Sequence, residues 1–198
     1  TLQHGSTNVF ALDMRGEVLL IGSQDSSAKR WSVPQLECTA TMAGHTALVW
    51  SVAIGAQFMA SGSGDSTVRI WDDKGACLRT LQPGSAVCAI SVEGDVLAAG
   101  CADGAIYTWS VSTGKQTRKL TGHSGLVSSV RLCGSLLLSG AEDNALRVWS
   151  IPEDEKGECI ATLAAHTDRV IGVALAPGGG KIASLSYEGE LITWAPKA

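Results

Sequence analysis

The residues that could do chemistry in this 198-residue chain are six cysteines, four histidines, and the serines and aspartates that follow the histidines. Paired cysteines could hold zinc or form disulfides, and a histidine between a carboxylate and a serine could activate that serine as a nucleophile. No two cysteines have the C-x-x-C spacing that favours a zinc site, and the sequence has no phosphate-binding glycine loop. We therefore predict neither a bound metal nor a cofactor.

Three of the cysteines recur in one local pattern, CTATM, CLRTL and CIATL, at Cys38, Cys77 and Cys159. Residues that recur once per structural unit lie one unit apart, beyond the ~7 Å Cα separation that a disulfide allows. We predict that these three side chains are small buried hydrophobic groups and form no disulfide. Such use of cysteine is typical of a reducing compartment, so we expect a cytoplasmic protein, with the nucleus as the alternative.

Five similar segments set the period of the chain, and each ends in a tryptophan. They are GSQDSSAKRW, GSGDSTVRIW, GCADGAIYTW, GAEDNALRVW and LSYEGELITW, ending at Trp31, Trp71, Trp109, Trp149 and Trp194. The spacing is about 40 residues, which is typical of repeat proteins. Two apolar runs with the alternation of β-strands precede each tryptophan, and no helical period is visible. We predict an all-β domain of five four-stranded units, approximately 1–33, 34–73, 74–111, 112–152 and 153–198.

Two further motifs occur in register with these tryptophans. Gly-His pairs stand at Gly44-His45 and Gly122-His123, and a Trp-Asp pair stands at Trp71-Asp72. The five units resemble the WD-repeat (β-transducin-like) family over essentially the whole chain. The resemblance implies a β-propeller of four-stranded antiparallel blades around a central channel. We expect the five units to be part of a larger ring of about seven blades; a complete five-bladed ring and an open propeller completed by a partner are the alternatives.

The resemblance also implies a role for the recurring polar residues. In this family a histidine, a serine or threonine, an aspartate and the tryptophan of one blade form a buried hydrogen-bonded chain. Carried over, the sets are His45, Ser61, Asp65, Trp71; His123, Ser139, Asp143, Trp149; and His166, Ser184, Glu188, Trp194. The first unit has His4, Asp25 and Trp31 but Ile21 at the serine position, and the third has Asp103 and Trp109 but Ala99 there. Because catalysis needs one constellation in one cleft, we interpret the repeated sets as structural and predict no enzyme activity.

Propellers of this family usually bind partners on the face where the channel is narrower. The positions of this chain that map to that face and carry large side chains are Phe10, Leu48, Trp50, Leu126, Arg169, Ile171 and Tyr187. Trp50 is the only tryptophan outside the repeat, which favours a binding anchor; packing in the channel or on the next blade is the alternative. For Arg169, the alternative is an ion pair with Asp168 or Glu188.

Composition excludes several classes of function. Hydrophobic residues make up 45% of the chain, charged residues make up 17%, and the net charge is −4. These values are typical of a folded domain. No run of lysine or arginine is present, so we expect no nucleic-acid partner, and we interpret Lys29-Arg30 as an ordinary solvated pair. The longest apolar stretches, such as Val87–Val92, are strand-sized, so we expect no insertion into a membrane.

The function that these expectations favour is a non-enzymatic scaffold that binds other proteins or peptides and positions them within a multiprotein complex. The short turns RGEV, EGDV and CGSL are similar to those of F-box WD-repeat proteins. The first alternative is therefore the substrate-recognition module of an F-box type ubiquitin ligase. The second is a structural subunit of a large assembly, such as an axoneme or a ribosome-processing particle.

Overall fold

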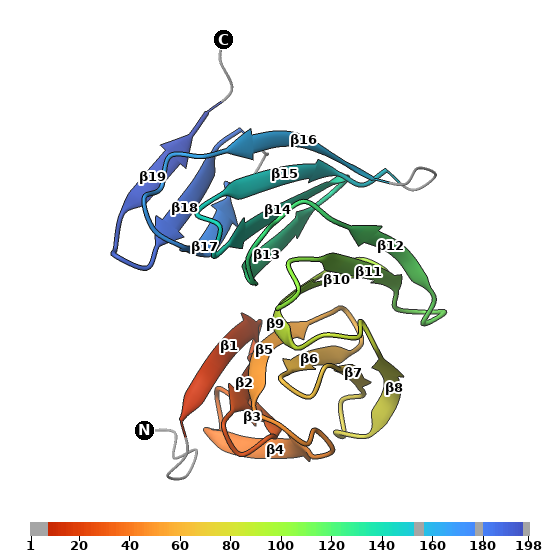
Figure 1. Ribbon diagram of the computed structural model, residues 1–198. Helices are drawn as coiled ribbons and strands as arrows, with labels where there is room; N and C mark the ends of the chain where they lie inside the picture. Colours follow the sequence, from red (N-terminus) through yellow and green to blue (C-terminus); the bar gives the residue numbers. More distant parts are fainter. Residues whose placement is uncertain (1–7, 153–156, 177–179, 196–198) are drawn as a thin grey trace.

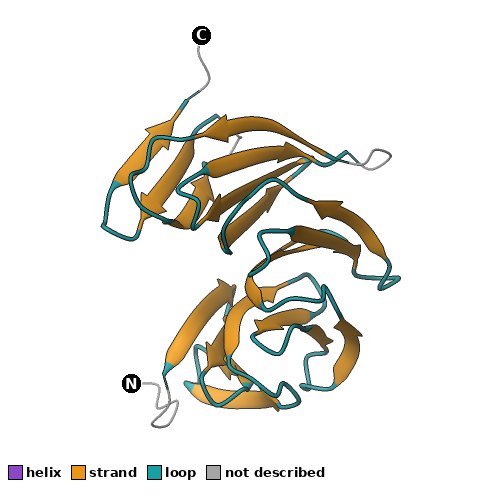
Figure 2. Ribbon diagram, in the orientation of Figure 1, coloured by secondary structure: helices purple, strands orange, loops and turns teal. Residues whose placement is uncertain are grey.

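A computed structural model of the chain describes residues 8–152, 157–176 and 180–195. These residues form nineteen β-strands joined by loops, as Figure 2 shows. No helix long and apolar enough to cross a membrane occurs within this part of the chain.

The strands form five antiparallel sheets in chain order, which we call blades one to five. Blade one contains β1 (Val9–Arg15), β2 (Val18–Ser23), β3 (Ala28–Ser32) and β4 (Glu37–Met42). Blade two contains β5 (Val49–Ile54), β6 (Met59–Ser63), β7 (Val68–Trp71) and β8 (Cys77–Leu81). Blade three contains β9 (Val87–Glu93), β10 (Val96–Cys101), β11 (Ile106–Ser110) and β12 (Gln116–Leu120). Blade four contains β13 (Val127–Cys133), β14 (Leu136–Ala141), β15 (Leu146–Ser150) and β16 (Glu158–Leu163). Blade five contains β17 (Val170–Leu175), β18 (Ile182–Ser186) and β19 (Leu191–Trp194).

Within a blade each strand pairs with the next along the chain, and the first strand of every blade is the innermost. The innermost strands β1, β5, β9, β13 and β17 contact one another in that order, so the blades follow an arc (Figure 1). The prediction of an all-β propeller of antiparallel blades is confirmed. The number of blades in the ring stays a prediction.

Neighbouring blades pack through one repeated contact between a glycine and a valine. In each of the first four blades the second strand carries a glycine, and the inner strand of the next blade presses a valine against it. A Cβ atom on Gly22 would lie 2.9 Å from Val49 Cγ1, and one on Gly100 would lie 2.5 Å from Val127 Cγ1. Any side chain there would push the blades apart, so glycine sets the distance between them.

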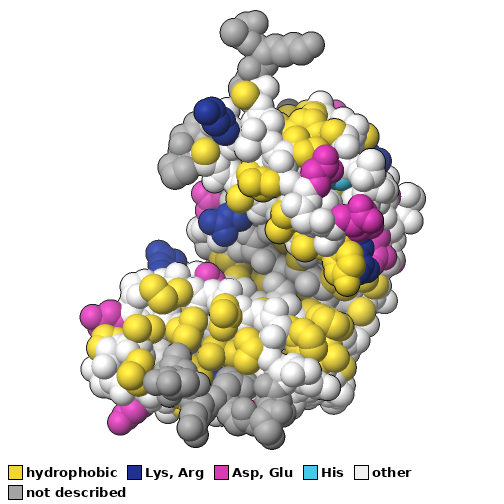
Figure 3. All heavy atoms as spheres, turned by 90° about the vertical axis from the view of Figure 1, so that its left-hand side faces the viewer, with side chains coloured by type: hydrophobic (Ala, Val, Ile, Leu, Met, Phe, Trp, Pro, Cys, Tyr) yellow, Lys and Arg dark blue, Asp and Glu magenta, His cyan; other side chains and the backbone are white. Residues whose placement is uncertain are grey.

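The two ends of the arc expose apolar side chains. Leu12 on β1 is 64% exposed, whereas the equivalent Val52 and Ile90 of the next two blades are each 7% exposed. On blade five, Leu191 is 67% exposed, although the equivalent Leu146 of blade four is fully buried. Figure 3, which faces the side with the first and last blades, shows hydrophobic side chains on both.

The structure corrects the prediction that Cys38, Cys77 and Cys159 are buried: all three are exposed, and all six cysteines are free thiols. The three lie at the start of the outermost strands β4, β8 and β16, where one edge of the sheet has no further strand. Each sulfur atom lies near the threonine three residues along its own strand; Cys77 Sγ, for example, lies 3.8 Å from Thr80 Oγ1. Cys77 and Cys159 also lie near an arginine of the adjacent strand. The recurring sequence pattern therefore identifies structurally equivalent positions in the blades, and these positions lie on the surface.

Candidate functional site

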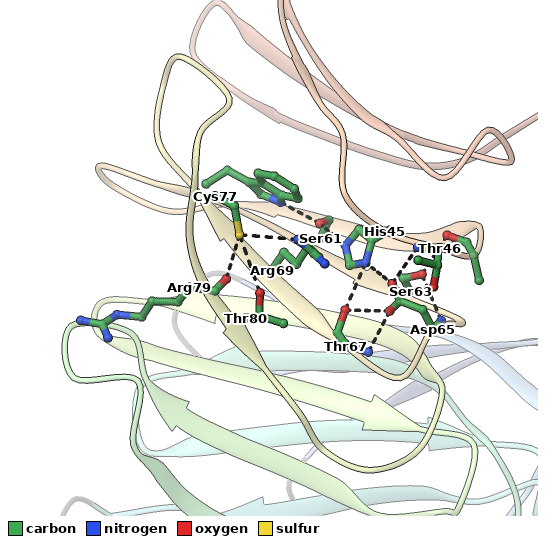
Figure 4. Close-up of polar contacts among 12 residues, drawn as sticks. His45, Thr46, Ser61, Ser63, Asp65, Thr67, Arg69, Cys77, Arg79 and Thr80 are labelled. Atoms are coloured by element: carbon green, nitrogen blue, oxygen red, sulfur yellow. Dashed lines mark hydrogen bonds and ion pairs between the residues drawn. The ribbon is translucent and has the colours of Figure 1, made fainter.

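The second blade contains a hydrogen-bonded chain of four side chains, shown in Figure 4. His45 Nδ1 lies 2.8 Å from Asp65 Oδ2, and His45 Nε2 lies 2.7 Å from Ser61 Oγ. Trp71 Nε1 donates to the same Ser61 oxygen at 2.8 Å. Since the carboxylate only accepts, His45 donates to it through Nδ1 and accepts the Ser61 proton at Nε2. The four groups thus satisfy one another in a region from which water is excluded.

The structure also shows partners of Asp65 that the sequence analysis did not include. Asp65 Oδ1 accepts from the Thr67 amide at 2.9 Å and from the Thr67 hydroxyl at 2.7 Å. Asp65 Oδ2 accepts from the Thr46 amide at 3.0 Å. A threonine two residues after the aspartate is the sequence signal for the first two contacts. The carboxylate therefore closes the turn between β6 and β7 and ties it to the loop that carries His45.

The fourth blade repeats the arrangement. His123 Nδ1 lies 2.9 Å from Asp143 Oδ2, His123 Nε2 lies 2.7 Å from Ser139 Oγ, and Trp149 Nε1 donates to Ser139 Oγ at 2.8 Å. The Ser61 and Ser139 side chains are fully buried, and each hydroxyl oxygen accepts a hydrogen bond from an indole N–H. A substrate carbonyl cannot reach either hydroxyl. This geometry supports a structural role for the sets and gives no support to a hydrolase.

In the fifth blade the structure corrects one residue of the predicted set. His166 Nε2 lies 2.7 Å from Ser184 Oγ, and Trp194 Nε1 donates to Ser184 at 2.9 Å. The carboxylate on His166 Nδ1, at 3.0 Å, belongs to Glu190 and not to Glu188. In the turn, Glu190 takes the place that Thr67 has in blade two, and Thr67 Oγ1 also lies near its histidine, 3.2 Å from His45 Nδ1. A longer acidic side chain at that place reaches the ring directly.

This correction gives a matched pair of variants. Glu190→Ala is expected to lower the free energy of unfolding by about 0.5–1 kcal/mol, because it removes the acceptor of a buried imidazole although the Glu190 side chain is itself half exposed. Glu188→Ala, two residues away, is expected to change it by less than about 0.5 kcal/mol. Urea denaturation of both variants measures the difference. Equal destabilisation by the two would contradict the assignment.

The first and third blades have incomplete sets. Buried Trp31 Nε1 has no hydrogen-bond partner among the described residues, because Ile21 stands where the serine stands in blade two. Asp25 instead accepts from the Ser27 amide and forms an ion pair with Lys29 at 3.3 Å. His4 lies outside the described residues. In the third blade Asp103 accepts from the Tyr107 hydroxyl at 3.2 Å, and Trp109 stacks on Tyr107.

The buried sets make stability depend on pH. Burial lowers the pKa of His45 below 6.5, against the opposing effect of Asp65, and burial acts in the same direction on His123. Burial also pushes the pKa of Asp65 upward, but hydrogen bonds from Thr67, the Thr46 amide and His45 outweigh it and hold the pKa at about 2.

The sign of the pH effect follows from which state binds more protons. The unfolded chain binds protons on His45 and His123 near pH 6.5 while the folded chain does not, so stability falls as pH drops below 6.5. Asp65 adds stability above pH 3.8 that is lost as pH falls from 3.8 to about 2. We expect denaturation midpoints to decline in these two windows. In a His45→Gln/His123→Gln variant the decline between pH 7 and pH 5 should flatten, and an unchanged decline would contradict this origin.

One edge of the five blades is built from a repeated backbone hydrogen bond between two loops. In each blade an amide in the turn after the second strand donates to the carbonyl of the residue just before the inner strand. The five pairs, at 2.9–3.1 Å, are Gln24–Asn8, Gly64–Leu48, Ala102–Ala86, Glu142–Leu126 and Tyr187–Arg169. These pairs place the predicted face residues side by side on one edge of the arc, which we call the rim.

On the rim of the first two blades, two aromatic side chains lie together. The rings of Phe10 and Trp50 are 4.7 Å apart between centroids and tilted by 52°. The Trp50 indole also packs over Gly64: a Cβ atom there would be 3.5 Å from Trp50 Nε1. Both aromatic side chains remain 40% exposed. Trp50 therefore packs on the neighbouring blade and still presents a large apolar surface to solvent.

On the rim of the fourth and fifth blades, a cation lies on an aromatic ring. Arg169 Cζ is 3.9 Å from the centre of the Tyr187 ring, and Arg169 Nη1 lies 3.4 Å from Glu142 Oε1. The sequence analysis named Asp168 or Glu188 as the alternative ion-pair partner of Arg169, but the observed partner is Glu142. Asp168 accepts a hydrogen bond from the Arg169 backbone amide instead. Tyr187 is 63% exposed, so the guanidinium is held in place at the surface.

The remaining predicted face residues are less prominent. Ile171 is exposed, whereas the side chains of Leu48 and Leu126 are half-buried. Cys88 stands at the position in blade three that Trp50 has in blade two, and burial, with Glu142, raises the pKa of its thiol to about 11, which favours the neutral thiol. No group of three side chains suited to holding a metal ion occurs within residues 8–152, 157–176 and 180–195.

Comparison with known proteins identifies the repeat. The family described as "WD domain, G-beta repeat" matches residues 36–72, 75–110, 114–150 and 157–194. The chain is 35% identical over 124 residues to the periodic tryptophan protein 2 homolog of Schizosaccharomyces pombe, covering 59% of this chain and 14% of that protein. It is 31% identical over 133 residues to mitochondrial division protein 1 of Sclerotinia sclerotiorum, covering 66% of this chain and 18% of that one.

A third relative and a solved structure extend the comparison. Identity to autophagy-related protein 16 of Arabidopsis thaliana is 33% over 109 residues, covering 52% of this chain and 21% of that protein. The chain thus spans less than a quarter of the length of these relatives. The crystal structure of the computationally designed Ika8 protein superimposes with a TM-score of 0.83 at 24% identity, over 98% of this chain and 60% of that one, which shows a shared fold.

Proposed function

This chain belongs to the WD40 family of repeat proteins, whose members generally act as non-enzymatic interaction scaffolds, and on that premise we propose that its rim binds a partner protein. The observation that carries the proposal is the Phe10–Trp50 pair, two large aromatic side chains from adjacent blades that pack on each other and stay 40% exposed. Aromatic and arginine side chains dominate the energetics of protein interfaces. Arg169, fixed on Tyr187, supplies such a second contact on the same rim.

We propose that the rim recognises its partner through apolar and aromatic contacts, and that one oriented cation, Arg169, adds a charged contact. The relatives carry names that refer to different processes, mitochondrial division and autophagy among them. Because these names refer to no single process, the proposal is limited to binding of a partner protein. We place the protein within a multiprotein complex, in the cytoplasm or the nucleus.

The experiment is affinity capture of the full-length protein followed by mass spectrometry. A Trp50→Ala/Arg169→Ala double variant is compared with a Leu78→Ala/Arg79→Ala control, which removes the same kinds of side chain from the exposed outer strand β8. Loss of one partner set from the folded rim variant alone supports the proposal. An unchanged partner set would refute it.

The identity of the captured partners separates the finer hypotheses. Blades one, three and four have short turns after the inner strand, at Gly16–Glu17, Gly94–Asp95 and Gly134–Ser135, the feature that suggests an F-box type ligase receptor. Ubiquitin-ligase subunits among the rim-dependent partners would favour that role. Subunits of one large particle would favour the assembly role.

A further inference from the structure

We propose that the protein has a second binding site, on the face opposite the rim, for an acidic segment of a partner protein that places an apolar side chain next to a carboxylate. The site is a cavity of about 290 Å³ at the junction of blades one and two. Its walls include Val18, Arg30, Ile54, Phe58, Met59 and Asp73. The proposal goes beyond the rim and is independent of it.

Arg30, which lines the cavity, is the only charged residue at its position in the five blades; the others are Ile70, Thr108, Val148 and Thr193. Arg30 pairs with Leu20 in the register in which Ile70 pairs with Ala60 and Val148 pairs with Leu138. At this position, one residue before the tryptophan, blades two and four bury an apolar side chain, Ile70 at 1% and Val148 at 7% exposure. Blade one places a charged, partly exposed residue, Arg30, there.

A second departure from the repeat forms the facing wall. The connection after the inner strand is two residues in blade one, Gly16–Glu17, but four residues in blade two, Gly55–Phe58. The extra length closes a turn in which the Gly55 amide donates to the Phe58 carbonyl at 2.9 Å. The Phe58 ring lies directly on Gly55, where a Cβ atom would be 2.4 Å from it. In repeat proteins, insertions in the loops of one face often mark a binding face.

The charge at this cavity is incompletely paired. Arg30 Nη1 donates to Thr39 Oγ1 at 2.6 Å, but no carboxylate of the described residues lies within ion-pair distance of the guanidinium. Asp73, at the cavity edge, is exposed and therefore screened by solvent. An arginine guanidinium beside apolar walls favours a planar carboxylate, which it can bind through two parallel hydrogen bonds.

The size of the cavity fits this ligand. A volume of about 290 Å³ lies at the lower end of the range for small-molecule sites, so a large cofactor does not fit. The apolar walls of Val18, Ile54 and Phe58 suit one hydrocarbon side chain. Charge complementarity with Arg30 then favours a peptide in which an acidic residue stands next to that hydrocarbon side chain.

The test uses two capped probe peptides, acetyl-Gly-Phe-Asp-Gly-amide and its neutral acetyl-Gly-Phe-Asn-Gly-amide counterpart, titrated into the ¹⁵N-labelled protein. The acidic probe is expected to shift the amides of Arg30 and of residues 54–59 and to bind at least fivefold more tightly than the neutral one. Arg30→Met should abolish this preference. Lys29→Met, which removes the neighbouring charge that pairs with Asp25, should keep it.

Three results would overturn the proposal, and the first two are equal affinity of the two probes and a preference that survives Arg30→Met. Amide shifts confined to the rim would overturn it as well. Folding does not obscure the outcome, because other blades carry isoleucine and valine at this position. Trp50→Ala should leave probe binding unchanged, so failure at the rim and failure at this cavity are distinguishable.

Discussion

Replacing Ser61 with alanine is expected to lower the free energy of unfolding by about 2–4 kcal/mol, because it leaves two buried groups without a partner. Trp71 Nε1 would lose its acceptor at 2.8 Å, and His45 Nε2 would lose its donor at 2.7 Å. Ser61 is fully buried, so water cannot replace the hydroxyl without opening the blade. Guanidinium denaturation followed by tryptophan fluorescence measures the change.

The matched control is Ser124→Ala, which removes an exposed hydroxyl and is expected to change stability by less than about 0.5 kcal/mol. A double-mutant cycle with Trp71→Phe isolates the indole contribution, since phenylalanine keeps most of the packing and removes the N–H. Part of the cost of Ser61→Ala should disappear in the Trp71→Phe background. A loss below about 0.5 kcal/mol for Ser61→Ala in the parent protein would show that the set contributes little to stability.

The first blade shows that the fold tolerates an incomplete set. Trp31 Nε1 is buried without a partner, and Ile21 fills the serine position with apolar volume. Apolar packing there offsets part of the cost of the unpaired N–H. The hydrogen-bonded set is therefore a source of stability within each blade, and the packing of blade on blade defines the architecture.

The architecture was predictable because its signal is local and repeated. Five tryptophans in register and two alternating runs before each one define four strands per unit without any long-range contact. The same reasoning identified the His45 and His123 sets, whose members are fixed by their position within one blade.

Contacts that depend on side-chain reach or on a neighbouring blade were beyond sequence reasoning. Glu190 replaces Glu188 because side-chain length, not alignment, decides which carboxylate meets His166. Arg169 contacts Glu142, a residue of another blade. Arg30 lines a cavity because a loop of blade two lies opposite it. In each case the decisive partner is distant in sequence or displaced from its expected register.

Trp50→Ala is expected to weaken binding of the rim partner by about 30-fold or more, the effect of losing an interface anchor worth about 2 kcal/mol. The reason is geometric: Phe10 and Gly64 hold the indole in one orientation while 40% of its surface stays available to a partner. A pre-oriented side chain loses little conformational freedom on binding, so most of its apolar contact appears as affinity. Calorimetry with the partner found by affinity capture measures the change.

Stability must be measured on the same variants, because the interpretation depends on it. Trp50 is half exposed, so Trp50→Ala should change the free energy of unfolding by less than about 1 kcal/mol, far less than Ser61→Ala. Trp50→Phe, which keeps an aromatic contact with Phe10, should recover part of the affinity. Leu78→Ala, which removes another exposed apolar side chain, on β8, should leave binding unchanged. If Trp50→Ala instead unfolds the domain while binding per folded molecule is preserved, Trp50 has a structural role and does not bind the partner.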